Sequence, residues 1–374
     1  MKRVVVTGAQ GLLGWHASAR LHAQNCGAGF RGEPAPFDLV RLDRAGFEDD
    51  AALKAAVTGA DLVLHYAGQN RGDPAEVEAA NPAIAQRLVE ACRAVGAAPH
   101  IVYANSTHAA GDTPYGRGKA KAADVLAGLG SGLTNVILPH IFGEAARPHY
   151  NNVTATLIDA ILKGETPELN PDGRVSLLHA GDAVQIAIDQ GLNRVSETVS
   201  PAGRDISVMD LFARIKGYHD SYTAGIYPDF SDPFDVALFN SYREASYPGS
   251  WPRPLKLNTD ARGTLFEAVK GGGGGQTFLS TTEPGVTRGD HFHLHKVERF
   301  LVVQGEAVIR LRKALTDEVY EYHVSGSAPA PVDMPTLYTH SIENTGTEPL
   351  LTLFWTHDLF DPQNPDTYFD KVLA

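Results

Sequence analysis

The stretch from Tyr247 to Pro254 divides the chain into two kinds of sequence, and this division constrains the fold more than any other feature. It holds three prolines in eight residues, a composition typical of a linker because proline ends helices and strands. Aliphatic runs alternate with helical stretches before it, whereas short apolar runs between glycine and proline turns follow it. We therefore predict a first domain over residues 1–246, a linker over 247–256 and a second domain over 257–374.

The first region has the pattern of a parallel sheet. Its aliphatic runs occupy residues 4–6, 38–42, 62–65, 101–103 and 136–138. Helical stretches between such runs predict βαβ units, in which helices cover both faces of the sheet. We therefore expect an α/β Rossmann fold for the first region. The short apolar runs of the second region predict an all-β domain.

A glycine-rich turn directly follows the first aliphatic run. It reads Thr7-Gly8-Ala9-Gln10-Gly11-Leu12-Leu13-Gly14 and precedes a helical stretch. Glycines there let the backbone approach a pyrophosphate and let the helix pack on the strand. Because glycine supplies 37 of the 374 residues, the pattern alone is weak evidence, and a simple strand–helix turn is the alternative. Its position favours dinucleotide binding by Gly8, Gln10, Gly11, Leu12 and Gly14.

The second predicted strand ends at Asp43-Arg44. An acidic side chain at this position binds the ribose hydroxyls of NAD, whereas an arginine suits the 2′-phosphate of NADP. Both residues are present, so the residues themselves leave the choice open. We expect NADP(H), with NAD(H) as the alternative.

Tyr115 and Lys119 follow the fourth predicted strand and lie four residues apart, so they share one face of a helix. A lysine cation beside a phenol lowers the phenol's pKa from ~10. We therefore expect Lys119 to activate Tyr115 for proton transfer, with Ser106 holding the same substrate oxygen. Tyrosine and lysine at this spacing are common on surface helices. The combination with Ser106 and the glycine-rich turn indicates catalysis instead.

Two segments of the second region offer metal ligands. Residues 285–305 include His291, His293 and Glu298, and residues 335–344 include His340. His291 and His293 alternate along a strand and therefore face the same side. Three histidine nitrogens and one carboxylate suit a divalent metal such as zinc, iron, nickel or manganese. A set of surface histidines is the alternative, which the bracketing glycines disfavour.

The composition of the chain indicates which partners it can bind and in which compartment it works. The chain has 32 Lys and Arg against 44 Asp and Glu, a formal net charge of −12, and no Lys/Arg run that would favour nucleic acid or a membrane surface. Cys26 and Cys92 fall in predicted helices and are expected to be buried thiols of a reducing compartment. We recognise no signal-peptide pattern and no apolar run of ~20 residues. We expect a cytoplasmic protein.

The first region resembles the extended short-chain dehydrogenases/reductases of the nucleotide-sugar epimerase/dehydratase group. The matching positions are Thr7 to Gly14, Ala67, Gly68, Asn81, Ser106, Tyr115 and Lys119. The resemblance implies that Ala67 and Gly68 border the cofactor and that Lys119 also binds the nicotinamide ribose. The short spacing from Ser106 to Tyr115 leaves Thr107 as an alternative to Ser106.

The segments with the metal ligands resemble the paired motifs of the cupin family, small antiparallel β-barrels. Leu337 stands where the second motif usually has a glycine, so we expect a differently shaped turn there.

Nearly the whole chain is similar to a bifunctional group of capsular-polysaccharide reductases/epimerases. The similarity also rests on Phe142-Gly143, Tyr150 to Asn152, Arg262-Gly263, Thr287 to Gly289, Tyr338 to Asn344 and Phe360 to Tyr368. It implies a homodimer that acts on a UDP-sugar. The zinc-dependent cupin would epimerise C3 of a UDP-4-keto-6-deoxy-N-acetylhexosamine, and the first domain would reduce C4 with NADPH. His295, Lys296 and Tyr338 are then the candidate acid and base.

The alternatives differ in what the two domains do. The cupin could serve only in dimerisation, or the whole chain could be a non-catalytic dinucleotide sensor, which an intact Ser–Tyr–Lys group disfavours. Dehydration or 4-epimerisation is a further alternative. Dehydratases usually place an acidic pair beside the catalytic threonine, whereas Ser106-Thr107-His108 stand here. Ile137 and His140 replace an Arg and an Asn of the similar group, which leaves the exact sugar open.

Overall fold

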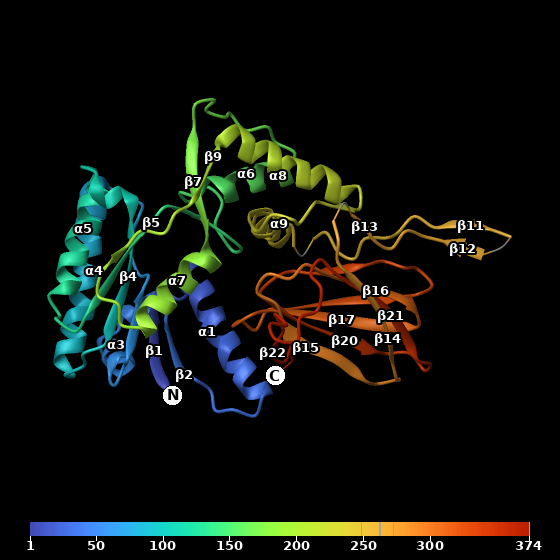
Figure 1. The fold of residues 1–374 in the computed structure, drawn as a ribbon, viewed down its shortest axis with the longest axis horizontal. Coiled ribbons are helices and arrows are strands. Elements are labelled where there is room, and N and C mark those ends of the chain that lie inside the picture. The colour runs from blue at the N-terminus through green and yellow to red at the C-terminus, as the bar shows by residue number, and fades with distance from the viewer. Residues whose placement is uncertain (248, 262, 272, 374) are drawn as a thin grey trace. The chain divides into compact units, whose positions relative to one another are not determined.

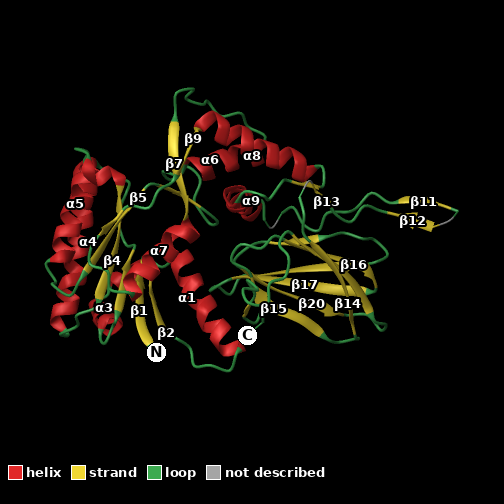
Figure 2. Ribbon diagram, in the orientation of Figure 1, coloured by secondary structure: helices red, strands yellow, loops and turns green. Residues whose placement is uncertain are grey.

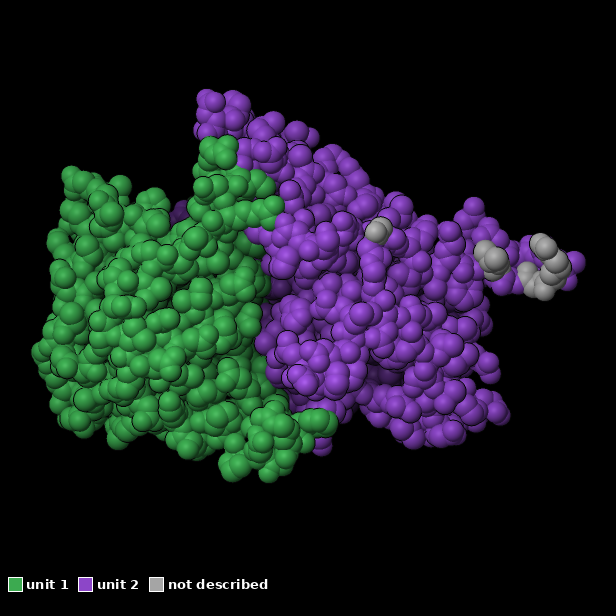
Figure 3. Space-filling view, viewed as in Figure 1, with its two compact units in different colours: residues 1–142, 174–206 green, residues 143–173, 207–374 purple. Residues whose placement is uncertain are grey.

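A computed structural model describes residues 1–247, 249–261, 263–271 and 273–373. Contacts divide the chain into two compact units, Met1–Phe142 with Arg174–Ile206 (unit 1) and Gly143–Gly173 with Ser207–Ala374 (unit 2) (Figure 3). Pro248 of the expected linker and Arg262 of the Arg262-Gly263 motif lie outside the described residues.

Unit 1 is built on a parallel sheet with the strand order β2-β1-β3-β4-β5-β8. The strands are β1 (Lys2–Thr7), β2 (Phe37–Leu42), β3 (Leu62–His65), β4 (His100–Ser106), β5 (Leu133–Leu138) and β8 (Thr198–Val199). The predicted α/β Rossmann fold is thereby confirmed. The order reverses between β1 and β3, and ligands of such sheets bind beyond the carboxyl ends of the strands at this point.

Helices cover both faces of the sheet (Figure 1). They are α1 (Leu12–Phe30) and α7 (Ala180–Leu192) on one face, and α3 (Asp50–Val57), α4 (Pro74–Ala94) and α5 (Pro114–Ala127) on the other. Successive side chains of a strand point to opposite faces, so β1 supplies both cores. Val4 and Val6 pack in one cluster with Leu21 of α1, and Val5 packs in the other with Leu88 of α4.

Shorter elements complete the connections of unit 1. They are α2 (Arg44–Glu48), the 3₁₀ turn η1 (Thr107–Ala110), and the sheet β6-β7-β9 of β6 (His140–Phe142), β7 (Arg174–His179) and β9 (Arg204–Ser207). Cys26 and Cys92 are both free thiols, and Cys92 is buried. Within the described residues, none of the helices combines the length and the hydropathy that crossing a bilayer requires.

Unit 2 contains an all-β barrel made of two antiparallel sheets, as the sequence predicts (Figure 2). One sheet has the order β14-β21-β16-β19, with β14 (Gln276–Thr282), β21 (Leu350–Thr356), β16 (Glu298–Gln304) and β19 (Val332–Met334). The other has the order β18-β17-β20-β15-β22, with β18 (Val319–Ser325), β17 (Glu306–Lys313), β20 (Tyr338–Asn344), β15 (Thr287–Phe292) and β22 (Tyr368–Phe369). Phe300, Leu301, Ile309, Leu311 and Ile342 are buried in its core.

Three helices that precede the barrel in the sequence belong to the same compact unit. They are α6 (Val153–Leu162), α8 (Val208–Thr223) and α9 (Pro233–Ala245). The remaining short strands are β10 (Ile226–Tyr227), which pairs with β13 (Lys270–Gly271), and the hairpin of β11 (Asn258–Asp260) and β12 (Gly263–Leu265).

A buried ionic group joins these helices to the barrel. Asp333 of β19 accepts hydrogen bonds from the hydroxyl groups of Tyr222 and Tyr227, the latter at 2.5 Å, and from Arg299 Nε at 2.6 Å. All four residues are at least 96% buried. The compact units thus divide the chain at positions other than the linker, and the boundaries 1–246, 247–256 and 257–374 stay a prediction.

Candidate functional site

The turn between β1 and α1 presents backbone groups at the start of the helix. Gly8 has φ +65°, and Gly11 N donates to Gly8 O at 2.9 Å. Gly11 is the N-cap of α1 and makes no side-chain cap hydrogen bond, so the helix N-terminus is left to interact with an anion. A Cβ on Gly14 would lie 2.1 Å from Gly8 O. Only glycine therefore allows α1 to approach the turn this closely.

The two residues that bear on cofactor choice have different surroundings. Asp43 Oδ1 accepts from Gly46 N at 2.8 Å and caps α2, and its Oδ2 lies 3.4 Å from Gln10 Nε2. Arg44 reaches the surface, where its Nε lies 2.8 Å from Glu48 Oε1 and its side chain is 88% exposed. The structure thus brings Gln10 and Asp43 together and places Arg44 beside them at the surface.

The loop after β3 lies against the glycine-rich turn. A Cβ on Gly8 would lie 2.8 Å from Ala67 N, and one on Gly68 would lie 2.8 Å from Asn81 Oδ1. Asn81 fixes the loop, because its Nδ2 donates to Gln69 O at 2.8 Å and its Oδ1 accepts from Gln69 N at 3.2 Å. The fold therefore assembles the residues expected to border the cofactor at the reversal point of the sheet.

Ser106 and Tyr115 come together at the end of β4. The two side chains lie close enough together for Ser106 to affect the pKa of Tyr115, whereas Thr107 is exposed. Lys119, one turn further along α5, is buried. Its Nζ donates to Ala104 O at 2.5 Å and lies 4.1 Å from the centroid of the Tyr103 ring.

The pKa of Tyr115 is raised above its ordinary 10, because burial outweighs the opposing effect of the Ser106 hydrogen bond. The expectation that Lys119 lowers this pKa is therefore wrong. The Lys119 ammonium is directed at Ala104 O instead, and burial lowers its own pKa to about 7. A tyrosine with a raised pKa is a neutral phenol near pH 7, which is the form that can donate a proton.

Two glycines that the sequence reasoning missed hold α5 in place. A Cβ on Gly116 would lie 2.1 Å from His108 O, and one on Gly118 would lie 2.8 Å from Glu78 O. The helix that carries Tyr115 therefore packs directly on η1 and α4. The sequence signal for this close packing is the pair of glycines between the catalytic candidates, in Tyr115-Gly116-Arg117-Gly118-Lys119.

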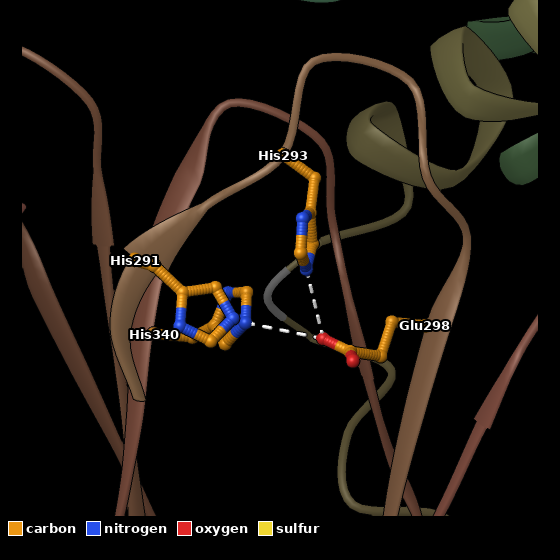
Figure 4. Close-up of side chains that lie close together, drawn as sticks. All are labelled: His291, His293, Glu298 and His340. Atoms are coloured by element: carbon orange, nitrogen blue, oxygen red, sulfur yellow. Dashed lines mark hydrogen bonds and ion pairs between the residues drawn. The ribbon is translucent and has the colours of Figure 1, made fainter. Parts of the chain in front are cut away.

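The four predicted metal ligands converge in the barrel of unit 2 (Figure 4). His291, His293, Glu298 and His340 each offer one ligand atom, and these four atoms all lie within 4.8 Å of one another. Glu298 Oε2 lies 3.0 Å from His293 Nε2 and 3.2 Å from His340 Nε2. His293, Glu298 and His340 are buried, and His291 is partly buried.

A β-bulge aims one of these ligands. Gly289 pairs with Ser341, and His291 pairs with the adjacent His340, so Asp290 is an extra residue with φ +56°. Such a bulge re-aims a side chain, and here it places His291 opposite His340.

The expected departure at Leu337 takes a specific form. Leu337 has φ +63°, the left-handed region that glycine adopts at least cost. Its N–H donates to His293 O at 2.8 Å, and its own O accepts from Ala314 N at 2.9 Å. These bonds hold a strained leucine in the turn before β20.

The histidine hydrogen bonds test whether the four residues suit a cation. His293 Nδ1 lies 2.5 Å from Asp366 O, and His340 Nδ1 lies 3.1 Å from Tyr338 O. A carbonyl only accepts, so each Nδ1 carries the proton and each neutral ring turns an Nε2 lone pair towards Glu298. Lone pairs facing a carboxylate repel it unless a cation lies between them, and the buried His340 Nε2 has no hydrogen-bond partner among the described residues. The donor set therefore fits a divalent metal ion.

The three candidate acid–base residues do not share one cavity. His295 and Lys296 line a cavity of about 190 Å³ with Asp358 and Asp366. These two carboxylates raise the pKa of His295 to about 9 against the effect of burial. Tyr338 does not line this cavity.

Tyr338 lies near Glu244 instead, with its hydroxyl 3.4 Å from Glu244 Oε1. Burial first, and the Glu244 charge second, raise the pKa of Tyr338.

The fold and the first site define the class of protein. The model of the NAD dependent epimerase/dehydratase family matches residues 4–197, and that of the polysaccharide biosynthesis C-terminal domain matches residues 258–368. The chain therefore belongs to the NAD-dependent epimerase/dehydratase family, with a polysaccharide biosynthesis domain at its C-terminal end.

Two relatives extend over both domains. The chain is 32% identical over 380 residues to the UDP-2-acetamido-2,6-beta-L-arabino-hexul-4-ose reductase of Pseudomonas aeruginosa, covering 99% of each chain. It is also similar to the crystal structure of the capsular polysaccharide assembling protein CapF from Staphylococcus aureus, with a sequence identity of 27%. That similarity covers 99% of this chain and 100% of the other, with a TM-score of 0.59.

Two further solved structures are similar. One is CapF with the inhibitor 3-isopropenyl-tropolone, at 26% identity and a TM-score of 0.54, covering 99% of this chain and 100% of the other. The other is a UDP-N-acetylglucosamine 4-epimerase from Methanobrevibacter ruminantium, at 18% identity and a TM-score of 0.53, covering 65% of this chain and 97% of the other. The latter similarity concerns the fold alone.

Proposed function

We propose that this protein reduces the C4 ketone of a UDP-4-keto-6-deoxy-N-acetylhexosamine in capsular or surface polysaccharide biosynthesis. The observation that carries the proposal is that the fold brings Ser106 beside Tyr115 at the end of β4, with Lys119 on the same helix as Tyr115. The full-length similarity to a reductase of a UDP-hexul-4-ose supports the same substrate class.

The reduction needs a hydride at C4 and a proton at its oxygen. The nicotinamide cofactor supplies the hydride when bound. Tyr115, whose raised pKa keeps it protonated near pH 7, donates the phenolic proton to the oxygen. Ser106 donates a second hydrogen bond to that oxygen and holds it beside Tyr115.

We propose NADPH as the cofactor. Asp43 already accepts hydrogen bonds from Gly46 and Gln10, whereas the exposed Arg44–Glu48 ion pair costs little to exchange. Arg44 can then pair with the 2′-phosphate.

Arg44→Ala should weaken NADPH binding by about tenfold and NADH binding by much less. Equal effects on the two dissociation constants in a fluorescence titration would exclude this role.

We further propose that the barrel epimerises C3 of the same sugar before reduction. His291, His293, Glu298 and His340 would hold a divalent ion, with zinc favoured by the nitrogen-rich ligand set. Such an ion supplies positive charge that stabilises the developing enolate oxygen when the proton at C3 is removed.

Inversion at C3 requires one group to remove a proton and another to return one. His295, Lys296 and Tyr338 stay the candidates. The pKa of Tyr338 is raised, which suits the acid better than the base. His295 also has a raised pKa, of about 9, between Asp358 and Asp366, so it too is better suited to donate a proton.

One experiment tests both steps. The UDP-4-keto-6-deoxy-N-acetylhexosamine is incubated in deuterated buffer with and without NADPH, using the parent protein, Tyr115→Phe and His340→Ala. We expect deuterium at C3 without NADPH in the parent and in Tyr115→Phe, and none in His340→Ala. Tyr115→Phe should reduce C4 at least ~10²-fold more slowly.

The outcomes separate the alternatives. Reduction by Tyr115→Phe within threefold of the parent rate would exclude Tyr115 as the acid. Unchanged C3 exchange in His340→Ala would exclude the metal-dependent step. If neither the parent protein nor Tyr115→Phe incorporates deuterium at C3 while the parent still reduces C4, the barrel serves in assembly rather than catalysis.

We also propose a cytoplasmic homodimer. The free thiols of Cys26 and Cys92 and the expected dependence on NADPH and a UDP-sugar support the compartment. Phe278 and Leu279 are 40% and 61% exposed on β14, an edge strand of its sheet, and such an edge can pair with a second copy. Light scattering gives the molar mass of the parent protein and of Leu279→Lys in solution. The parent should have the mass of a dimer, and the variant should shift towards the mass of a monomer.

A further inference from the structure

The histidines of the proposed metal site are not all oriented in the same way. His340 Nδ1 donates to Tyr338 O, the carbonyl two residues earlier in the same strand. His293 Nδ1 instead donates to Asp366 O, which is 73 residues further along the chain. The orientation of His293 therefore depends on how the C-terminal segment docks on the barrel.

Asp366 also holds the loop that follows His293. Its Oδ1 accepts from Leu294 N at 2.9 Å, and its Oδ2 accepts from His295 N at 3.1 Å and Lys296 N at 2.9 Å. This loop joins β15 to β16, and therefore connects His291 and His293 to Glu298. The Asp366 carboxylate thus fixes the backbone of the loop that connects the candidate ligands His291 and His293 to the candidate ligand Glu298.

The surroundings of Asp366 suit a fixed structural anion. Its side chain is almost fully buried, and His295 Nδ1 lies 3.0 Å from Asp366 Oδ2 in addition to the backbone N–H groups of the loop. Asp366 has φ +43°, a conformation that Asp, Asn and Gly adopt more readily than other residues. The left-handed backbone lets Asp366 present its carbonyl to His293 and its carboxylate to the loop at the same time.

Neighbouring residues dock the same segment on the strand that carries the ligands. In β22, Tyr368 pairs with Phe292 and Phe369 pairs with His291. Beyond it, Asp370 N donates to Asp290 O at 2.9 Å and Val372 N donates to Asp290 Oδ1 at 3.1 Å. Asp290 is the extra residue of the bulge that aims His291. The C-terminal segment is therefore fixed both at His291 in β15 and at His293 just beyond the end of this strand.

We propose that Asp366 is the positioning residue of the metal centre. Its carbonyl and carboxylate set the ring of His293 and the loop to Glu298, and so couple metal affinity to docking of the C-terminal segment. The inference rests on the proposed metal site and adds a residue outside the ligand set to it. Asp366 contacts neither the substrate nor the metal in this role.

The test is metal binding by the full-length protein. Asp366→Gly removes the carboxylate while keeping the left-handed backbone accessible, and Asp366→Asn keeps the shape but removes the charge. After removal of bound metal by chelation, the parent and both variants are titrated with zinc chloride against a chromophoric chelator. They are also titrated with cobalt chloride, and the visible absorption spectrum is recorded. Asp361→Asn is the matched control, because Asp361 is exposed in the same segment and, among the described residues, its side chain accepts a hydrogen bond only from Gln363 N.

Asp366→Gly should bind zinc about 10–100-fold more weakly, as losses of groups that orient metal ligands usually do. Its cobalt spectrum should change, because without the carboxylate the loop over residues 294–296 no longer holds the carbonyl of residue 366 against His293. Asp366→Asn should recover part of both effects. Asp361→Asn should match the parent protein. Parent-like zinc affinity and cobalt spectrum in Asp366→Gly would overturn the proposal.

Two controls keep the result decisive. If circular dichroism shows that Asp366→Gly does not fold, Asp366→Asn decides, and parent-like values for it would overturn the proposal. If the parent protein itself binds neither zinc nor cobalt, the proposed metal centre fails and this inference fails with it. Zinc binding by the parent with no effect in either Asp366 variant removes only the role of Asp366.

Discussion

Ser106 and Thr107 are adjacent in the sequence, yet only Ser106 reaches Tyr115. Ser106 is partly buried at the end of β4 and lies close enough to Tyr115 to affect its pKa, whereas Thr107 begins η1 and is exposed. We therefore expect Ser106→Ala to slow reduction by about 10²-fold, because a hydrogen bond to the substrate oxygen is lost. Thr107→Ala should stay within about twofold of the parent rate. Steady-state NADPH oxidation with the 4-keto sugar nucleotide measures both. A larger loss in Thr107→Ala than in Ser106→Ala would reverse the assignment.

Burial of Lys119 gives the second prediction at this scale. Its pKa is about 7 in the folded protein against an ordinary 10.5, so the unfolded chain binds more protons between these values. The contribution of Lys119 to stability is therefore least favourable below pH 7 and improves as the pH rises towards 10.5. Lys119→Met removes the buried charge and should raise the free energy of unfolding at pH 7 by about 1–3 kcal/mol.

Urea unfolding of Lys119→Met and the parent protein between pH 6 and pH 10 checks this prediction. The difference between the two proteins should shrink as the pH rises. A constant difference across the range would mean that Lys119 does not titrate in the folded protein. Reduction should be lost in the variant at every pH, because Lys119 is part of the proposed site.

At the scale of elements, the packing of α1 depends on one glycine and not on another. A Cβ on Gly14 would lie 2.1 Å from Gly8 O, whereas nothing lies within 4 Å of a Cβ on Gly29 in the same helix. Gly14→Ala must push α1 away from the turn and should destabilise unit 1 by more than about 2 kcal/mol. It should also abolish cofactor binding. Gly29→Ala should stabilise the helix by about 0.5–1 kcal/mol. Thermal unfolding with and without NADPH measures both, and similar effects of the two substitutions would contradict the packing argument.

At the scale of the whole molecule, the buried group around Asp333 joins helices and barrel into one compact unit. Asp333→Asn would leave Arg299 without its carboxylate in a site that is closed to water. Removal of one partner of such a pair costs about 3–5 kcal/mol. Asp220→Asn breaks an exposed pair with Lys216 on α8 and should cost less than about 0.5 kcal/mol. Urea unfolding should show this contrast, and equal losses would mean that the buried pair contributes no more than the surface one.

The same packing predicts how a shortened chain behaves. A fragment ending at residue 255 loses Asp333, and the hydroxyl groups of Tyr222 and Tyr227 lose their acceptor. Tyr227 also loses the Trp355 ring on which it stacks, and Phe230 loses the ring of His357. We expect the fragment to aggregate, and size-exclusion chromatography of its expression product measures this. A monodisperse fragment that binds NADPH would instead support independent domains on either side of residues 247–256.

Local patterns in the sequence determined much of the fold and of both sites. Alternation of aliphatic runs and helical stretches was enough to predict the parallel sheet. The glycine-rich turn could be placed because it follows the first strand. His291 and His293 could be paired because side chains two residues apart on a strand share a face. These features depend on neighbours within a few residues or on a strongly repeated period.

Only the tertiary structure decided the properties that depend on residues far apart in the chain. Burial of Tyr115 reversed the expected direction of its pKa shift, and burial is a property of the packed core. The bulge at Asp290 and the left-handed backbone at Leu337 and Asp366 have no periodic signal. The contact from Asp366 to His293 spans 73 residues. The sequence by itself predicted four candidate metal ligands, but only the folded chain brings together the distant groups that orient them.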